Sequence, residues 1–255
     1  MAPCLPHGHD VKQPSNRTNI LIQAAQRLGV ATNALKFASP VSFVYNPLIY
    51  AWSCHEEYLW RFGGGKKRVA FLGMNPGPFG MVQTGIPFGQ IAAVRDWLKI
   101  DQQVGRPARE HPRRPVTGFD CQRSEVSGER LWGLFAERFG RPEAFFVEHM
   151  VMNYCPLAFL EVTGRNRTPE KLASAEKETL FEVCDEHLRA SVAVLQPDWL
   201  IGIGDIAFQR AKAVFEVSKL KLGRVLHPSP ASPAANRGWS AAATRQLEQL
   251  GVWKP

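Results

Sequence analysis

The feature that most constrains the fold is a set of short apolar segments that alternate with stretches of helical periodicity. Runs of this length and composition are typical of strands that are buried on both faces of a sheet. The four predicted strands cover residues 68–73, 144–152, 198–203 and 224–226. Alternation of strands with helices predicts a mostly parallel sheet with crossover helices. We therefore expect an α/β protein with a central, mostly parallel four-stranded sheet that is flanked by helices.

Helical patterns fill most of the chain between these segments. The predicted helices cover residues 18–28 (ending at Gly29), 47–62, 87–99, 128–139, 206–217 and 233–250, with a further long helix capped by Thr168-Pro169. A long polar loop is expected at 101–126. Because neither a repeat nor a clear linker divides the chain, we expect residues 17–255 to form a single domain. Residues 1–16 are expected to be a flexible tail.

The charge balance narrows the class of partner. Lys and Arg number 31 against 23 Asp and Glu, which gives a formal net charge of +8. This balance favours polyanions, nucleic acid first and an acidic membrane surface second, and a basic housekeeping enzyme is the competing interpretation. We expect no membrane span and no secretory signal, hence an intracellular location in the bacterial cytoplasm or the eukaryotic nucleus. The five cysteines lack ligand spacing, so neither a disulfide framework nor a metal centre is expected.

Polar side chains follow three of the predicted strands. Asn75, Asn153 and His227 each come just after an apolar run. Because ligands of open α/β sheets bind beyond the carboxyl ends of the strands, we expect these side chains to converge. Taken singly, each has a structural interpretation: a turn at Asn75, a strand-end amide at Asn153 and a hydrogen-bonded structural histidine at His227. Together they favour a site.

The residue types in these segments exclude several reaction classes. The three segments carry no carboxylate, and the chain lacks the lipase elbow, the P-loop and the zinc-deaminase motif. Amides can hold a water molecule or read the edge of a base, and a histidine can donate to an oxygen on which charge develops. Such a set suits hydrolysis of an N-glycosidic bond through an oxocarbenium-like sugar. Phe79 and Phe88 are candidates to stack on a base, and the arginines of 106–114 and the segment 229–239 are candidates for phosphate contacts.

Two long motifs resemble one known family. The sequence GMNPGPFGM at 73–81, followed by QTG at 83–85 and PFG at 87–89, resembles the first motif of the single-strand-selective monofunctional uracil-DNA glycosylases. The sequence HPSP at 227–230, with Pro233 and the later Asn236 and Trp239, is similar to their second motif. The similarity runs from about residue 37 to 252.

This resemblance implies the fold of the uracil-DNA glycosylase superfamily and a base flipped into the site. Asn75 would position the attacking water, and His227 would stabilise the uracil anion through its O2. The reaction would need no metal or other cofactor and would leave an abasic site for base excision repair. No lysine lies in the three segments, so a Schiff-base lyase step is not expected.

The resemblance also assigns the substrate-binding residues. Asn153 would read the O4 and N3–H edge of uracil, and Phe88 would stack on the base. The backbone near Met74 would add contacts. Gly77 would leave room beside C5, through which the family also admits oxidised bases such as 5-hydroxymethyluracil.

The segment after His227 resembles the family's wedge, which fills the gap left by the flipped nucleotide. The expected DNA-binding residues are Ser229, Pro230, Ala231, Ser232, Pro233, Asn236 and Arg237. At Ala231 the chain departs from the family, which has an arginine there. We expect either weaker action on duplex DNA or a plug supplied by Arg237.

Two other functions compete with uracil excision. One is a glycosylase of the same fold that acts on another damaged base, such as xanthine or hypoxanthine. The other is a protein that binds damaged bases without cleaving them. In the leading interpretation the partner is uracil-containing DNA, single- or double-stranded, and the protein is a monomer. A metal site at Cys4, His7 and His9 is a remote alternative.

Overall fold

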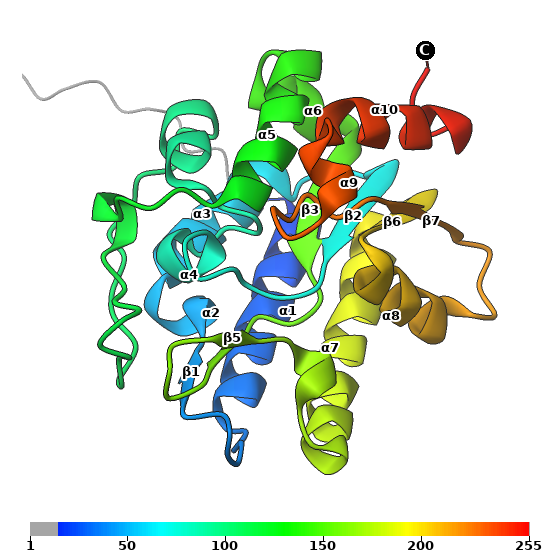
Figure 1. The fold of residues 1–255 in the computed structure, drawn as a ribbon. Helices are drawn as coiled ribbons and strands as arrows, with labels where there is room; N and C mark the ends of the chain where they lie inside the picture. Colours follow the sequence, from blue (N-terminus) through cyan, green and yellow to red (C-terminus); the bar gives the residue numbers. More distant parts are fainter. Residues whose placement is uncertain (1–14, 255) are drawn as a thin grey trace, which may run out of the picture.

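The computed structural model describes residues 15–254, and its centre is a parallel sheet of four strands. The strands are β3 (His149–Asn153), β2 (Val69–Gly73), β6 (Trp199–Ile203) and β7 (Lys221–Val225), in that spatial order (Figure 1). Every neighbouring pair is parallel, and Gly73 lies opposite Asn153 in the register of β2 and β3. The predicted α/β class and the four-stranded sheet are confirmed.

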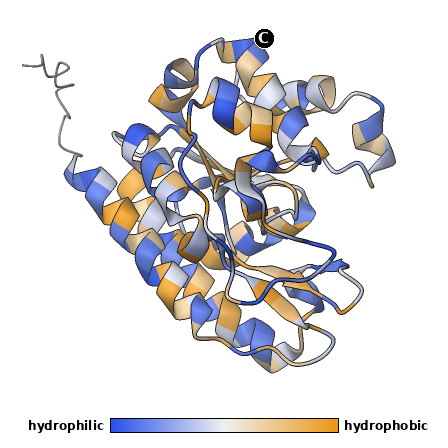
Figure 2. Cartoon of the chain, turned by 90° about the vertical axis from the view of Figure 1, so that its left-hand side faces the viewer, coloured by the Kyte–Doolittle hydropathy of each residue, from blue (hydrophilic) through white to orange (hydrophobic). Residues whose placement is uncertain are grey.

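Helices cover the sheet because each buries an apolar stripe. In α1 (Asn16–Asn33) the buried residues include Leu21, Ala25 and Leu28, which are spaced three and four residues apart. The helices alternate hydrophobic and hydrophilic positions along their length (Figure 2). The other long helices are α3 (Trp52–Phe62), α5 (Val126–Phe139), α7 (Ser174–Leu195), α8 (Asp205–Phe215) and α10 (Trp239–Gln249). No helix within residues 15–254 is both long and apolar enough to cross a bilayer.

Two helix boundaries near the start of the chain differ from the prediction. The first helix begins at Asn16, with Ser15 as its N-cap, and continues through Gly29, where the absence of a side chain lets it approach Leu48. The predicted helix 47–62 is interrupted at Ala51 and forms α2 (Pro47–Tyr50) and α3. Residues 1–14 of the predicted tail lie outside the described residues.

The predicted strand at 144–152 is wrong in its first half. Residues 142–148 form a helix, α6 (Pro142–Glu148), with Pro142 in its first turn, and only the five residues of β3 are extended. Phe145 of α6 stacks on Phe135 of α5 with 4.3 Å between ring centroids. An aromatic run carries no period that separates a buried helix from a strand, which explains the error.

Three further helix predictions need correction. Thr168-Pro169 opens only a 3₁₀ turn, η3 (Pro169–Lys171), and α7 begins at Ser174. The region 87–99 is helical only at 91–97, and η1 (Ala93–Trp97) within it is a π-helix. The predicted helix 233–250 is split by Gly238, whose φ of 117° ends the short α9 (Pro233–Asn236) before α10.

A second, smaller sheet was not predicted. It consists of β1 (Phe43–Tyr45), β4 (Ala158–Leu160) and β5 (Asn166–Arg167), which pair antiparallel. Strands of two or three residues are too short to show a period in the sequence. Beside this sheet run the loop 101–126, which contains the 3₁₀ turn η2 (Gly118–Asp120), and the short α4 (Met81–Thr84).

Candidate active site

The carboxyl edge of the sheet brings three of the expected side chains together. A Cβ placed on Gly73, the last residue of β2, would lie 2.4 Å from Asn153 Oδ1 and 2.5 Å from Phe88 Cε2. The rings of Phe88 and His227 are 6.1 Å apart between centroids. Glycine at 73 is therefore required for an amide and an aromatic ring to share the space above the strand end.

Asn153 has a buried side-chain amide with few hydrogen-bond partners in the protein. The residue is 9% exposed, and its Nδ2 donates only to the thioether sulfur of Met81, at 3.2 Å. No donor within residues 15–254 reaches its buried Oδ1. A buried acceptor without a partner is uncommon and costs stability, and a ligand N–H would satisfy it.

Phe88 is held in an uncommon backbone conformation. Its φ is +54°, in the left-handed region that non-glycine residues seldom adopt. The backbone of α5 packs closely against the Phe88 backbone, since a Cβ on Gly128 would lie 2.0 Å from the Phe88 carbonyl oxygen. Trp132 Nε1 donates to the neighbouring Pro87 carbonyl at 3.3 Å. Strain of this kind persists where the surroundings impose it, and it recurs at functional sites.

His227 is fixed in one tautomer. The backbone N–H of Ser229 donates to its Nδ1 at 3.1 Å, so in the neutral ring the proton lies on Nε2. Burial lowers the pKa of His227 below the ordinary value of 6.5, which favours that neutral ring. Gly204, with a φ of 89°, allows the close approach, because a Cβ there would lie 2.9 Å from His227 Cβ.

Asn75 lies two residues beyond β2, on a segment that still pairs with the chain after β3. The backbone N–H of Tyr154 donates to Gly73 and that of Cys155 to the buried Met74. Asn75 is half-buried, and its Nδ2 donates to the Leu157 carbonyl at 3.5 Å, at the limit for a hydrogen bond. This contact is the one hydrogen bond that the Asn75 side chain makes within residues 15–254.

The structure adds a carboxyl group that the sequence did not place here. A Cβ on Gly77 would lie 2.3 Å from Glu125 Oε2, so Glu125 fills the space beside this glycine. Burial raises the pKa of Glu125, while hydrogen bonds from the backbone N–H groups of Phe79 and Ser127 oppose that rise. Glu125 thus packs against the loop after Asn75 and accepts a hydrogen bond from it.

The expected wedge uses several of its side chains to shape itself. Ser229 Oγ accepts from the Ala231 N–H at 3.1 Å, and Ser232 caps α9. Asn236 Nδ2 donates to the Pro230 carbonyl at 2.9 Å. The exposed residues among those expected to bind DNA are Pro230, Ala231, Pro233, Asn236 and Arg237.

Arg130 ties this wedge segment to α5, a contact the sequence did not reveal. Its Nη2 donates to Asn236 Oδ1 at 2.9 Å and its Nη1 to the Pro228 carbonyl at 3.1 Å. Arginine suits this role because its planar group can serve two acceptors at once. The N-terminal end of α5, with its N-cap Glu125, therefore contacts the first motif through Glu125 and Gly128 and the wedge segment through Arg130.

No cluster of three or more His, Cys, Asp or Glu within residues 15–254 could hold a metal ion. The remote candidate site at Cys4, His7 and His9 lies outside the described residues.

Comparisons with known proteins match most of the chain. The model of the uracil DNA glycosylase superfamily matches residues 60–250. The chain is 46% identical over 228 residues to a single-strand selective monofunctional uracil-DNA glycosylase of Rattus norvegicus, covering 89% of this chain and 82% of the relative. It is also 46% identical over 244 residues to the Bos taurus protein of that name, covering 94% and 90%.

A solved structure shares the fold. The crystal structure of wild-type SMUG2 from Pedobacter heparinus superposes with a TM-score of 0.63 over 90% of this chain and 97% of that chain. The two sequences are 16% identical, so this likeness concerns the fold.

Proposed function

The chain belongs to the uracil-DNA glycosylase superfamily, alongside the single-strand selective monofunctional enzymes, and from this premise we propose that it hydrolyses the N-glycosidic bond of uracil in DNA. The products are free uracil and an abasic site for base excision repair. In this reaction the C1′–N1 bond breaks and its electron pair goes to the base, while water adds to C1′ and loses a proton. The uracil anion takes up a proton and leaves as neutral uracil.

The observation that carries this proposal is the free amide of Asn153. Uracil presents a C4 carbonyl acceptor beside an N3–H donor, which matches the Nδ2 donor and the unpartnered Oδ1 acceptor. Cytosine reverses this donor–acceptor order and would meet each end of the amide with a like group. Phe88, beside the same strand end, stacks on the face of the base.

The reaction needs a held water and a stabilised anion, and two residues supply them. Asn75 Oδ1 orients the water that attacks C1′ as the oxocarbenium-like sugar forms. His227 donates from Nε2 to uracil O2, where negative charge develops. Backbone groups near Met74 add contacts to the base. The chain's own groups suffice for these steps, so we assign no cofactor.

We extend the substrate range to uracils oxidised at C5, such as 5-hydroxymethyluracil, with Gly77 beside C5. Because Glu125 occupies the side of Gly77 on which a Cβ would project, an alanine there would collide with the Glu125 carboxyl group and displace the loop. Both single-stranded and double-stranded DNA are substrates in this proposal, with weaker action on the duplex. Ala231 carries too little volume to replace a base, and Arg237 is the remaining candidate plug in the wedge segment.

Further expectations accompany this function. The protein acts as a monomer inside the cell, either in the bacterial cytoplasm or in the nucleus. Excision of another damaged base such as xanthine or hypoxanthine is the second candidate, and binding without cleavage the third. The fit of the Asn153 amide to uracil favours the first.

The test uses an end-labelled oligonucleotide with one uracil, single-stranded and duplexed, in EDTA, followed by hot alkali to reveal abasic sites. The parent is compared with Asn75→Ala and His227→Leu, each checked for folding by circular dichroism. We expect alkali-dependent cleavage that both substitutions depress. Intact DNA after treatment with well-folded parent protein would refute uracil excision, and hypoxanthine and xanthine oligonucleotides would then separate the other two candidates.

A further inference from the structure

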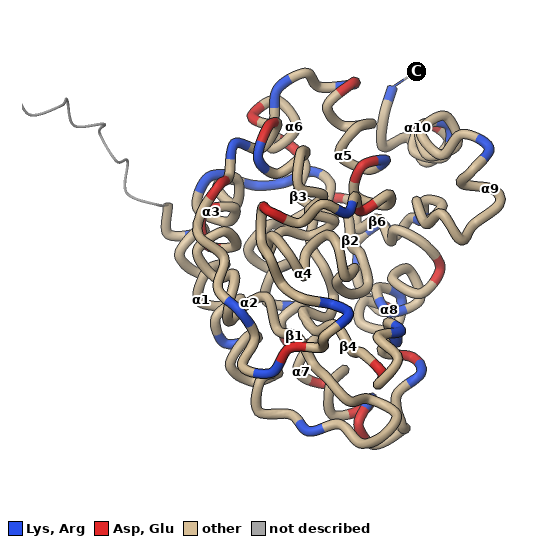
Figure 3. The backbone as a smooth tube through the Cα atoms, turned by 60° about the vertical axis from the view of Figure 1, so that its left-hand side comes forward, with Lys and Arg blue, Asp and Glu red and all other residues tan. Residues whose placement is uncertain are grey.

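We propose that the arginine-bearing loop 106–123 holds the phosphate backbone of the DNA strand next to the flipped nucleotide. This inference rests on the proposed function and assigns the substrate strand a path outside the base pocket. The loop carries Arg106, Arg109, Arg113, Arg114 and Arg123. Figure 3 shows Lys and Arg positions on the loops near α4 and β1, and Figure 1 shows α4 beside the sheet edge that carries the site.

The loop reaches the site through Phe79. The guanidinium carbons of Arg114 and Arg123 lie 5.3 Å and 5.0 Å from the centroid of the Phe79 ring. Phe79 belongs to the same motif as Asn75 and follows it by four residues. Two cations are therefore fixed beside the segment that is expected to hold the attacking water.

Most of these cations are free to meet phosphates. Arg106 pairs with Glu110 at 3.6 Å, but no acidic group in the described part of the chain pairs with Arg109, Arg113, Arg114 or Arg123. Arg109 lies over the Phe43 ring at 4.5 Å, and Arg114 Nε donates to the Gly164 carbonyl at 2.8 Å. Both contacts leave the terminal guanidinium nitrogens available.

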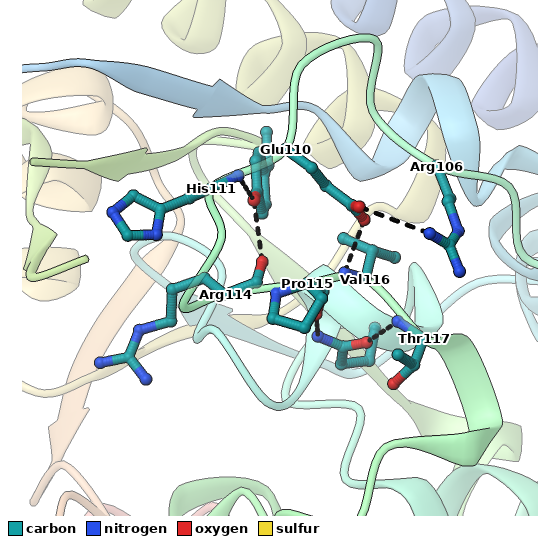
Figure 4. Close-up of polar contacts among 9 residues, drawn as sticks. Arg106, Glu110, His111, Arg114, Pro115, Val116 and Thr117 are labelled. Carbon is teal, nitrogen blue, oxygen red and sulfur yellow. Dashed lines mark hydrogen bonds and ion pairs between the residues drawn. The ribbon is translucent and has the colours of Figure 1, made fainter. Parts of the chain in front are cut away.

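The loop is held in place before any ligand binds (Figure 4). Glu110 accepts from the Val116 N–H at 2.8 Å, and the hydroxyl of Tyr45 links the backbone of His111 and Arg114. Gln83 of α4 donates to the Pro115 carbonyl and accepts from the Thr117 N–H. Because Gln83 is part of the first motif, the arginines are anchored to the catalytic half of the site. A preorganised loop loses less entropy when it binds.

A surface groove continues from this loop, and its lining suits single-stranded DNA. It contains Arg109 and Arg113 beside the half-buried rings of Phe37 and Phe43. Proteins that hold single strands combine cations for the phosphates with rings on which bases stack. The wedge segment, residues 229–238, differs, since Arg237 is its only Lys or Arg. The strand therefore gains most of its ionic contacts on the side of the first motif.

The test compares Arg109→Gln/Arg113→Gln with Arg27→Gln/Lys212→Gln, a control that removes the same charge from exposed positions of α1 and α8. Excision of uracil and equilibrium binding are measured on a single-stranded 20-mer between 50 and 200 mM salt. A uracil trinucleotide serves as the short substrate, because it lacks all phosphates beyond the two nucleotides that flank the uracil.

Arg109→Gln/Arg113→Gln loses two phosphate contacts, so we expect the negative slope of log K against log salt to become smaller in magnitude by about 1.4. Raising the salt from 50 to 200 mM would then cost the parent about sevenfold more affinity than it costs the variant. KM for the 20-mer should rise with kcat unchanged, the trinucleotide should be unaffected, and the control should match the parent. An unchanged slope, or an equal change in the control, would overturn the proposal. Failure of the parent to act on both the trinucleotide and the 20-mer would instead refute uracil excision.

Discussion

The two halves of the site, the first motif and the wedge segment, differ in how they are packed. The first motif, residues 73–89, is packed so closely that a Cβ on Gly73 or Gly77 would overlap a neighbouring side chain. The wedge segment, residues 229–238, lies mostly on the surface and is held by hydrogen bonds from Arg130 and Asn236. Groups that must meet a base in one geometry need a rigid support, whereas a segment that enters DNA must keep its outer surface free.

The charges divide in the same way. The packed half is flanked by the arginines of 106–123, while the wedge segment has Arg237 alone. A strand without a partner needs phosphate contacts along one side, and a duplex also needs a plug for the vacated position. The difference between the halves therefore predicts stronger action on single strands, and the following substitutions test it from the largest expected effect to the smallest.

Asn75→Ala removes the group that we propose orients the attacking water on the packed half. We expect kcat on single-stranded uracil DNA to fall by about 10³-fold, within the range for a lost proton-handling or positioning group, with little change in KM. Single-turnover kinetics measures the chemical step directly. A loss below tenfold would show that water is positioned by another group.

Gly128→Ala tests the close packing behind Phe88, with Gly133→Ala in the same helix as its matched control. The new methyl at 128 would meet the Phe88 carbonyl, so we expect a loss of about 1–3 kcal/mol in the free energy of unfolding together with reduced excision. Gly133 has open space around it, and alanine there should stabilise the helix by about 0.5–1 kcal/mol. Urea denaturation measures both. Equal effects at the two positions would contradict the close packing of α5 against Phe88.

The pH dependence of kcat tests the neutral state of His227. Because burial lowers the pKa of His227 below 6.5, the ring stays neutral at pH 7 and above, and protonation begins only in more acidic solution. A proton on Nδ1 would face the Ser229 N–H and break the contact that aims the ring. We expect a kcat that is flat from pH 7 to 9 as far as His227 is concerned, with an acid limb below pH 6.5. An acid limb above pH 7 would contradict the neutral donor.

Ala231→Arg tests the wedge and carries the smallest expected effect. The longer side chain should raise excision from duplex DNA several-fold by filling the vacated position, with single-stranded rates unchanged. Arg237→Ala serves as the companion, because a plug supplied by Arg237 would make that variant lose duplex activity. If Ala231→Arg excises uracil from duplex DNA no faster than the parent, the small volume of Ala231 does not limit action on the duplex.

The sheet and the strand-end residues could be predicted because their signals are local. Apolar runs mark β2 and β6, and the rule for strand ends brings Asn153 and His227 to one edge. The small sheet escaped prediction because its strands are too short to show a period. The contacts of Glu125 and Arg130 escaped because they join segments far apart in the sequence, and side-chain approach across a fold leaves no periodic trace.

The central claim is that the packed half reads the base, and two asparagines allow a matched test. Asn153→Ala and Asn236→Ala each remove one amide, the first from the strand end and the second from the wedge segment. Single-turnover excision from a single-stranded uracil oligonucleotide should fall about 100-fold for Asn153→Ala, as expected for lost hydrogen bonds in a buried site. It should change less than about threefold for Asn236→Ala, because the Asn236 amide bonds Pro230 and Arg130 within the surface wedge and not the base. Equal rates for the two variants, or a larger loss for Asn236→Ala, would contradict the assignment of base recognition to Asn153.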